Sequence, residues 1–282
     1  MKKYSSYFLV LLISFQFHAF SAVKAMDGDS TAVRQTTDTR PLSLIKSDFS
    51  KAADDGMRLV KAPFHFTTGQ WVATGAILGG TALAFAFDED MKQLVARNHT
   101  ELLDKLTPVG KNYGEVYTAA AISGVVYLGG LVSGSGEVRE TGRMLFESLA
   151  FAGIITTVLK SALGRSRPYM DEGAFKYRGL QFKTETTSLP SGHATVAFSV
   201  SSVLASRINN VYASIGLYGL AGFTAFQRIY DNKHWLSDTF LGAAIGTVIG
   251  QAIVHYGTGD NNNGGPLSLQ PSLNGFSIQI AF

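Results

Sequence analysis

Three short segments between Lys160 and Asp238 hold the residues whose types and spacing suit chemistry. They read Lys160-Ser-Ala-Leu-Gly-Arg-Ser-Arg167-Pro168, Pro190-Ser191-Gly192-His193 and Arg228-Ile-Tyr-Asp-Asn-Lys-His234-Trp-Leu-Ser-Asp238. Their candidate residues at the borders of apolar segments are three cations, two histidines and one carboxylate, namely Lys160, Arg167, Arg228, His193, His234 and Asp238. This set is typical of a site where an oxyanion is held by positive charge, attacked by a nucleophile and then released.

Each segment also has a plain structural interpretation. Lys160 and Arg167 are two helical turns apart, and cations at a helix end can simply complement its dipole. Ser191 suits the N-cap of a following helix, whose free amides bind anions but also begin ordinary helices. His234 and Asp238 are one turn apart, so the carboxylate can fix the imidazole tautomer, or the pair can lie on the surface.

Taken in order, the segments resemble the superfamily of type 2 phosphatidic-acid phosphatases, bacterial class A acid phosphatases and vanadium haloperoxidases. The family pattern is K-x6-RP, PSGH and SR-x5-H-x3-D. This chain matches it from Lys160 to Pro168, from Pro190 to His193 and from Arg228 to Asp238. Gln227 stands where the family usually has serine, which puts only a secondary phosphate contact in doubt.

The resemblance implies a role for each matched residue. His234 would attack phosphorus and form a phosphohistidine, and Asp238 would orient His234. His193 would protonate the leaving oxygen and then act as a base toward water. The phosphate oxygens would be bound by the remaining matched residues, which are Lys160, Arg167, Ser191, Gly192 and Arg228.

The composition argues against several other kinds of site. Zero cysteines exclude disulfides and thiolate chemistry, and a formal net charge of +3 without a basic stripe gives no argument for nucleic acid binding. No acidic cluster suits Mg²⁺, because Asp88-Glu89-Asp90 is a lone run that we interpret as a solvated helix end. We therefore expect no metal or cofactor, with vanadate required only if the chain is a haloperoxidase.

The N-terminus predicts export. Lys2 and Lys3 precede the apolar stretch Phe8–Phe17, and small residues lead to a cleavage site after Ala25. Residues 1–25 are thus interpreted as a signal peptide, with an uncleaved membrane anchor as the alternative. Residues 26–60 are a polar tail leading into a short amphipathic helix near Phe49, and residues 61–256 form the catalytic domain.

Six apolar segments predict an all-α bundle of about six core helices. They are residues 67–87, 113–132, 144–162, 194–207, 211–227 and 239–256. Residues 257–282 combine a Gly- and Asn-rich linker with an alternating end, from Phe276 to Phe282, that predicts a strand or hairpin. A terminal Phe also resembles outer-membrane barrel proteins, although two strands cannot close a barrel.

Charged residues make up 16% of the chain, below the average of about 25%, which favours packing at or in a membrane. The first three apolar segments approach the length of about 20 residues that a span needs, whereas the last three look short. A cleaved signal followed by three spans would leave Lys160 in the cytoplasm. An exported site therefore requires that one early segment does not cross, or that all of them are periplasmic.

These observations favour an exported, envelope-associated phosphatase that acts on a lipid phosphate monoester or diphosphate without a metal. The loop between Pro168 and Pro190 mixes aromatic and basic residues, and we expect it to influence substrate choice. The alternatives are a soluble periplasmic acid phosphatase for small esters, a vanadate-dependent haloperoxidase and a non-catalytic envelope scaffold.

Overall fold

The computed structural model describes residues 41–259, 267–272 and 275–280. The proposed signal peptide and the first part of the tail lie outside the described residues. The all-α prediction is confirmed for residues 41–259. Their nine α-helices are α2 (Pro41–Lys61), α3 (Thr68–Ala86), α4 (Asp88–Arg97), α5 (Glu101–Tyr113), α6 (Val116–Ser133), α7 (Gly136–Leu163), α8 (Gly192–Ile208), α9 (Val211–Tyr230) and α10 (Leu236–Thr258).

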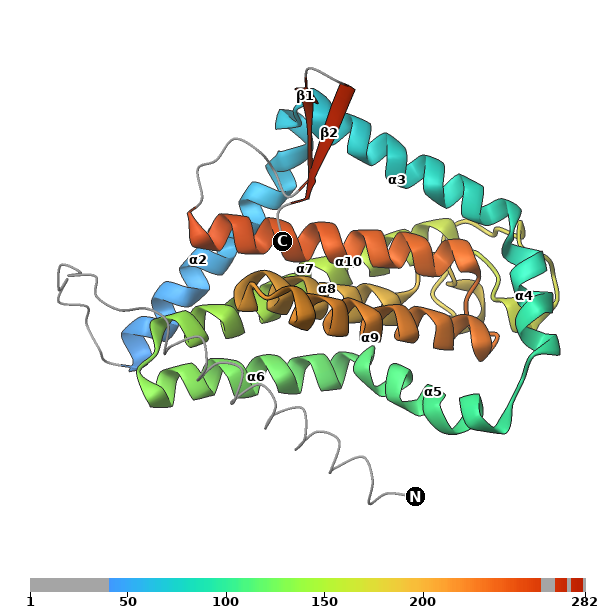
Figure 1. The fold of residues 1–282 in the computed structure, drawn as a ribbon, viewed down its shortest axis with the longest axis horizontal. Helices are drawn as coiled ribbons and strands as arrows, with labels where there is room; N and C mark the ends of the chain where they lie inside the picture. The colour runs from blue at the N-terminus through green and yellow to red at the C-terminus, as the bar shows by residue number, and fades with distance from the viewer. Residues whose placement is uncertain (1–40, 260–266, 273–274, 281–282) are drawn as a thin grey trace. The chain divides into compact units, whose positions relative to one another are not determined.

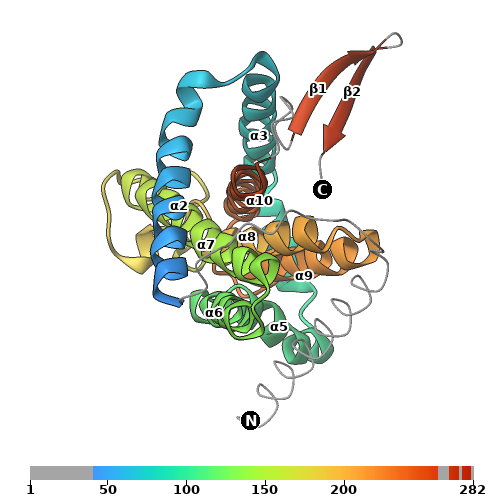
Figure 2. The ribbon, with the colours of Figure 1, turned by 90° about the vertical axis from the view of Figure 1, so that its left-hand side faces the viewer.

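Helix α8 forms the centre of the bundle. It packs against α7, α9 and α10, which surround it in both views (Figures 1 and 2). Its side chains Val196, Val200 and Val203 are almost fully buried, and Met144 of α7 and Ile253 of α10 close the core around them. Small residues such as Ala197, Ser199 and Ser202 occupy other buried positions of α8, which suits a helix that packs closely on several neighbours.

Local sequence signals place the three predicted segments at one end of this bundle. Gly164, with a φ of 63°, ends α7 in the left-handed conformation that glycine adopts readily. Ser191 is the N-cap of α8. Asp238 lies in the first turn of α10 and accepts a hydrogen bond from the Trp235 backbone N–H, at 2.9 Å. The end of α7 and the beginnings of α8 and α10 therefore meet.

A close approach between α8 and α10 holds two of these segments together. A Cβ atom at Gly242 would lie 2.5 Å from the Ser191 carbonyl oxygen, and one at Gly246 would lie 2.3 Å from that of Thr195. Only glycine allows two backbones to approach so closely. The spacing of four residues puts both glycines on the face of α10 that contacts α8.

Two regions differ from the sequence-based expectation. Helix α2 begins at Pro41 and spans 21 residues, so it is longer than the short helix expected near Phe49. Residues 88–113, assigned to a gap, form α4 and α5, although α5 contains Pro108 within it. These helices carry many charges and lack a long apolar run. Their packing against α9 through Val95, Tyr113 and Ile229 overrides the weak local signal.

Three helices, α6, α7 and α10, are long and apolar enough to cross a membrane. Helices α3 and α4 form a bent pair, with an angle of 54°, that could serve as a fourth span or as a re-entrant segment. The expectation that the last apolar segments are too short is wrong for α10, which extends over 23 residues. After the bundle, β1 (Leu267–Ser272) and β2 (Gly275–Ile280) pair antiparallel where a hairpin was expected.

Candidate active site

His234 lies in the turn between α9 and α10 and is almost fully buried. Its backbone N–H donates to the Arg228 carbonyl oxygen at 3.1 Å, which fixes the turn. The imidazole Nδ1 lies 3.4 Å from Asp238 Oδ2 and 3.4 Å from Ser188 Oγ. Because Nδ1 faces the carboxylate, Nε2 is the nitrogen that can act as a nucleophile.

Asp238 is fully buried and is held from several sides. Its Oδ2 accepts hydrogen bonds from the Trp235 backbone N–H at 2.9 Å and from Ser188 Oγ at 2.5 Å. Its carbonyl oxygen accepts from the Ser191 backbone N–H at 2.8 Å. One residue thus joins the second and third predicted segments.

The three predicted cations converge on His234. Lys160 Nζ donates to the carbonyl oxygens of Thr187 and Ser188, at 2.9 and 3.0 Å. Arg167 Nε donates to the Thr184 carbonyl oxygen at 2.7 Å. Arg228 is nearly buried at the end of α9, and its Nε has no hydrogen-bond partner among residues 41–259.

The electrostatics of this group suit an anion. Burial first, and then the charges of Lys160, Arg167 and Arg228, hold the pKa of His234 well below its usual value. Burial and the neighbouring Arg167 lower the pKa of Arg228 to about 10. When buried cations lie this close together, each disfavours the charge of the other. A negatively charged group bound between them therefore stabilises them strongly.

His193 stands at the start of α8, and its Nε2 lies 3.2 Å from Glu115 Oε1. Glu115 is the N-cap residue of α6. Burial, followed by the charge of Arg228, lowers the pKa of His193 to about 4, while Glu115 opposes that shift. The histidine is about one-quarter exposed, so it can reach a ligand at the bundle end.

Ser191 and Gly192 complete the predicted set. The hydroxyl of Ser191 is buried and accepts the Ala194 backbone N–H at 3.5 Å, so it caps α8. Gly192 is the first residue of α8. A Cβ atom there would lie 3.7 Å from Lys160 Cε, which places the Lys160 side chain against the helix start.

Sequence reasoning missed three contributors and misplaced a fourth. Ser188 and Glu115 gave no local signal, and Arg165 could not be distinguished from its neighbour Arg167. Asp88, interpreted as part of a solvated helix end, is instead 1% exposed and forms an ion pair with Arg165 at 2.6 Å. The start of α4 packs inside the protein, which explains the difference.

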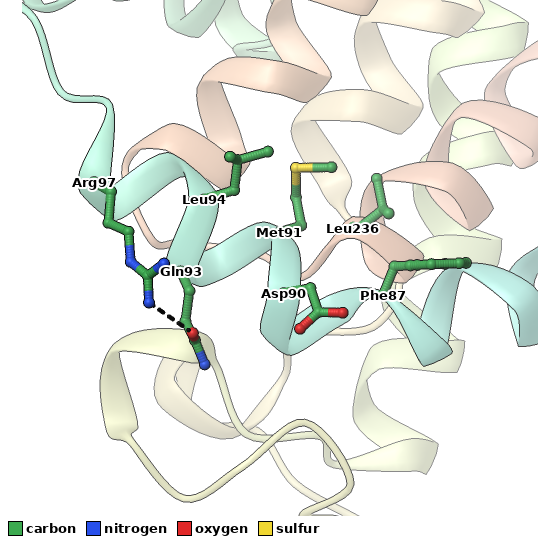
Figure 3. A pocket seen from close by; sticks show the side chains of 7 residues that line it. All are labelled: Phe87, Asp90, Met91, Gln93, Leu94, Arg97 and Leu236. Carbon is green, nitrogen blue, oxygen red and sulfur yellow. Dashed lines mark hydrogen bonds between the residues drawn. The ribbon is translucent and has the colours of Figure 1, made fainter.

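Surface depressions lie beside this site. One of about 430 Å³ separates α4 from the start of α10, and Figure 3 shows Met91, Leu94 and Leu236 along its apolar side. Another, of about 340 Å³, is lined by Ala82, Phe85, Ala86, Phe175 and Tyr177. The residues that line them include none of the eight predicted site residues.

A family comparison accords with this geometry. Residues 142–261 match the model of the PAP2 superfamily, and this range includes all three predicted segments. This part of the chain belongs to the PAP2 superfamily. Within the PAP2 segment, Gln227 replaces the usual serine, and its Nε2 donates to Asp231 Oδ2 at 2.5 Å.

Two curated proteins that resemble part of this chain are named lipid A 1-phosphatase. Over 121 residues, or 41% of its length, the chain is 31% identical to a lipid A 1-phosphatase of Porphyromonas gingivalis, and the match covers 24% of that protein. A lipid A 1-phosphatase of Rhizobium etli is 30% identical over 39% of this chain and 47% of its own length. The chain thus spans less than half the length of these curated relatives.

Two solved structures are similar to this chain as well. The crystal structure of Aquifex aeolicus LpxE aligns with a TM-score of 0.49 and 20% identity, covering 60% of this chain and 96% of that one. A transmembrane PAP2 type phosphatidylglycerolphosphate phosphatase from Bacillus subtilis aligns with a TM-score of 0.49 and 15% identity, covering 79% and 98%.

Proposed function

We propose that this chain is a phosphatase that hydrolyses a lipid phosphate monoester or diphosphate through a phosphohistidine on His234. The observation that carries the proposal is the placement of His234: it is buried, with Nδ1 toward Asp238 and with Lys160, Arg167 and Arg228 around it. The two lipid A 1-phosphatases that resemble part of this chain support the same reaction class.

In the first step, His234 Nε2 attacks phosphorus while the bond between phosphorus and the ester oxygen breaks. His193 donates a proton to the departing oxygen. Lys160, Arg167 and Arg228, with the first amides of α8, bind the non-bridging oxygens as charge builds on them. The depressed pKa of His234 keeps its imidazole unprotonated, and therefore nucleophilic, into the acidic range.

In the second step, His193 removes a proton from a water molecule that attacks the phosphohistidine. The P–N bond breaks, inorganic phosphate leaves and His234 regains its lone pair. Asp238 stabilises the positive charge that His234 carries while phosphorylated. The residues named here account for every proton moved, and no metal is assigned to the step.

Several surface features support a lipid substrate. Phe175, Leu180 and Phe182 are each at least two-thirds exposed on the loop that follows Arg167. The apolar depression lined by Phe85 and Phe175 lies next to this loop and could receive acyl chain carbons. With the candidate spans α6, α7 and α10, this arrangement suits a site at a membrane surface.

The test uses the full chain purified in detergent. We expect phosphate release from a lipid phosphate in EDTA, no release by His234→Ala, and full release by His65→Ala, which alters an exposed histidine far from these contacts. Loss of activity in EDTA would contradict a metal-free reaction. Faster hydrolysis of small esters than of lipid phosphates would favour a soluble acid phosphatase. Halide oxidation that depends on added vanadate would favour a haloperoxidase, and no turnover of any substrate would favour a non-catalytic scaffold.

We further propose that the protein is an envelope membrane protein with its site in the periplasm. Helix α2 contacts Arg139 near the start of α7 and Tyr256 near the end of α10, whereas the site lies at the other ends of both helices (Figure 1). If α3 crosses the bilayer, α2 and the site face opposite sides. A periplasmic site behind an N-terminal export signal therefore requires that α3 does not cross.

The absence of cysteine allows a direct test of sidedness. Single cysteines replacing the exposed Lys46 of α2 and Lys183 of the site loop are labelled with a membrane-impermeant maleimide. The exported site requires that the cysteine at position 183 reacts in intact spheroplasts, and an N-terminal export signal requires that the one at position 46 reacts there too. A cysteine at position 183 that reacts only after lysis would place the site in the cytoplasm.

A further inference from the structure

Arg165 is fully buried two residues after α7 ends, and all three of its guanidinium nitrogens are bonded. Its Nε donates to the Ala174 carbonyl oxygen at 2.8 Å, and Nη2 donates to Asp88 Oδ2 at 2.6 Å. Nη1 donates to Ser237 Oγ at 2.7 Å and to Asp238 Oδ1 at 2.6 Å. A planar guanidinium group holds both carboxylates with donors in a fixed geometry, whereas the three donors of an ammonium group rotate about a flexible stem.

Asp88 closes this network from the other side. Its Oδ1 accepts the Ser237 backbone N–H at 2.9 Å, and its Oδ2 accepts Ser237 Oγ at 2.7 Å. Ser237 directly precedes Asp238 in the first turn of α10. Asp88 therefore fixes the backbone that carries Asp238, while Arg165 fixes its side chain.

The two oxygens of Asp238 are used on opposite sides. Oδ1 is bonded to Arg165, and Oδ2 faces His234, Ser188 and the Trp235 backbone. With Oδ1 held, the carboxylate cannot rotate away from the imidazole without breaking a buried ionic hydrogen bond. Aromatic rings of Phe85 and Trp235, 4.4 and 5.4 Å from the guanidinium carbon, keep water away from that bond.

We propose that Arg165 and Asp88 are positioning residues that hold Asp238 Oδ2 against His234 Nδ1 and so fix the imidazole with Nε2 unprotonated. Neither residue touches the phosphate-binding cations, and both act through Asp238. The role of His234 as nucleophile rests on the proposed function. Its orientation by Arg165 and Asp88 rests on the contacts alone.

Two conservative variants test the two ends of the network. Arg165→Lys keeps the positive charge but loses the rigid fork of donors that holds both carboxylates, so Asp238 gains freedom to rotate. We expect kcat to fall about 100-fold, a loss comparable to that caused by a misplacement of about 1 Å, with KM within twofold. Asp88→Asn keeps the shape and loses one charge, and we expect a loss of about tenfold in kcat.

The decisive readout needs no turnover. The full chain labelled with ¹⁵N-histidine is examined by NMR, and the His234 signal is assigned by its absence in His234→Gln. We expect the wild type to show a single tautomer protonated at Nδ1, and both variants to show a second tautomer. Asp171→Asn is the matched control, because Asp171 pairs with Lys92 at 2.6 Å but is mostly exposed.

The results separate this inference from the proposed function. A folded Arg165→Lys or Asp88→Asn protein with the wild-type tautomer and kcat would overturn the positioning role. The proposed function would be overturned if the wild type hydrolysed no phosphate ester. If the variants still showed the second tautomer, the positioning role would stand. Melting temperatures of all variants identify any loss that comes from unfolding.

Discussion

Two buried charge clusters lie near opposite ends of α7 and are built from the same kinds of residue. Near the start of the helix, Arg139 and Arg143 meet three carboxylates, those of Asp48 and Asp55 from α2 and Glu147 from α7. Just beyond its end, Arg165 meets Asp88 and Asp238. Each cluster therefore has one more carboxylate than guanidinium group, and about 30 Å of helix separates Arg143 from the site.

The clusters differ in how fully their polar atoms are bonded. In the α2 cluster, Asp48 Oδ1, Arg143 Nε and Glu147 Oε2 have no hydrogen-bond partner within the described part of the chain. In the site cluster, every side-chain oxygen and nitrogen of Asp88, Arg165 and Asp238 is bonded. A buried network in which every polar atom is hydrogen-bonded is restricted to one geometry. This is the network on which the orientation of His234 depends.

The α2 cluster has a different consequence. It draws the charged face of α2 onto α7, so that Leu42, Phe49 and Val60 on the opposite face are each at least two-thirds exposed. A helix with ionic contacts inside and apolar side chains outside suits a lipid boundary better than water. One cluster thus attaches a helix to the bundle, and the other orients a reacting side chain.

The largest effect should come from breaking the site cluster at its centre. Asp238→Asn keeps the shape of the side chain but removes the charge that faces His234 Nδ1. We expect kcat to fall by about 10³-fold or more, because an amide favours the wrong imidazole tautomer. Steady-state kinetics and trapping of the phosphoenzyme measure the change.

Asp104→Asn is the control for that substitution, because its carboxylate accepts the Tyr230 hydroxyl at 2.6 Å and is mostly exposed. Its kcat should stay within twofold of the wild type. An Asp238→Asn enzyme of wild-type kcat would show that the contact between Asp238 and His234 has no part in the reaction.

Breaking the α2 cluster should change stability and leave the chemistry intact. Arg143→Met removes the partner of two buried carboxylates, Asp55 and Glu147. We expect the free energy of unfolding in detergent to fall by about 3 kcal/mol, since an uncompensated charge remains buried. The kcat of the folded fraction should stay within twofold.

The matched comparison for Arg143→Met is Glu140→Gln, which removes an exposed ion pair with Lys51. Pairs of that kind contribute about 0.5 kcal/mol or less. If Arg143→Met lowered kcat as strongly as Asp238→Asn while remaining folded, the two clusters would be coupled through α7, and the division of roles drawn here would be wrong.

Features whose signal is local in the chain could be predicted from the sequence. Apolar segments located six of the nine helices described in residues 41–259, and an amphipathic pattern near Phe49 located part of α2. Ser191 and Gly164 mark helix ends by their own chemistry. The spacing of the three segments selected eight residues that the fold gathers at one end of the bundle. In each case the signal lies within a few residues of the chain.

Pairing across long stretches of sequence could not be predicted in this way. Arg165 meets Asp88 across 77 residues, and Glu115 reaches His193 across 78. Whether a charged residue is buried depends on which helices pack around it, so Asp88 and Glu89 look alike in sequence. Only Asp88 is turned inward to meet Arg165.

The smallest predicted effect concerns a charge pair that water reaches, the one formed by His193 and Glu115. Both side chains are about one-quarter exposed, so solvent screens their interaction more than it screens either buried cluster. Glu115 raises the pKa of His193 against burial and Arg228, which together lower it to about 4. Glu115→Gln should therefore lower that pKa further.

The sign follows from the role of His193. As the acid for the leaving oxygen it must be protonated, so kcat falls as the pH rises through its pKa in the enzyme–substrate complex. In Glu115→Gln, the pH at which kcat falls should be lower by about one unit. Glu137→Gln, at the exposed start of α7, should leave that pH unchanged. If kcat of Glu115→Gln instead fell at a higher pH than that of the wild type, the proton donor would be another residue. A uniform loss of rate with no movement would instead make Glu115 a packing residue.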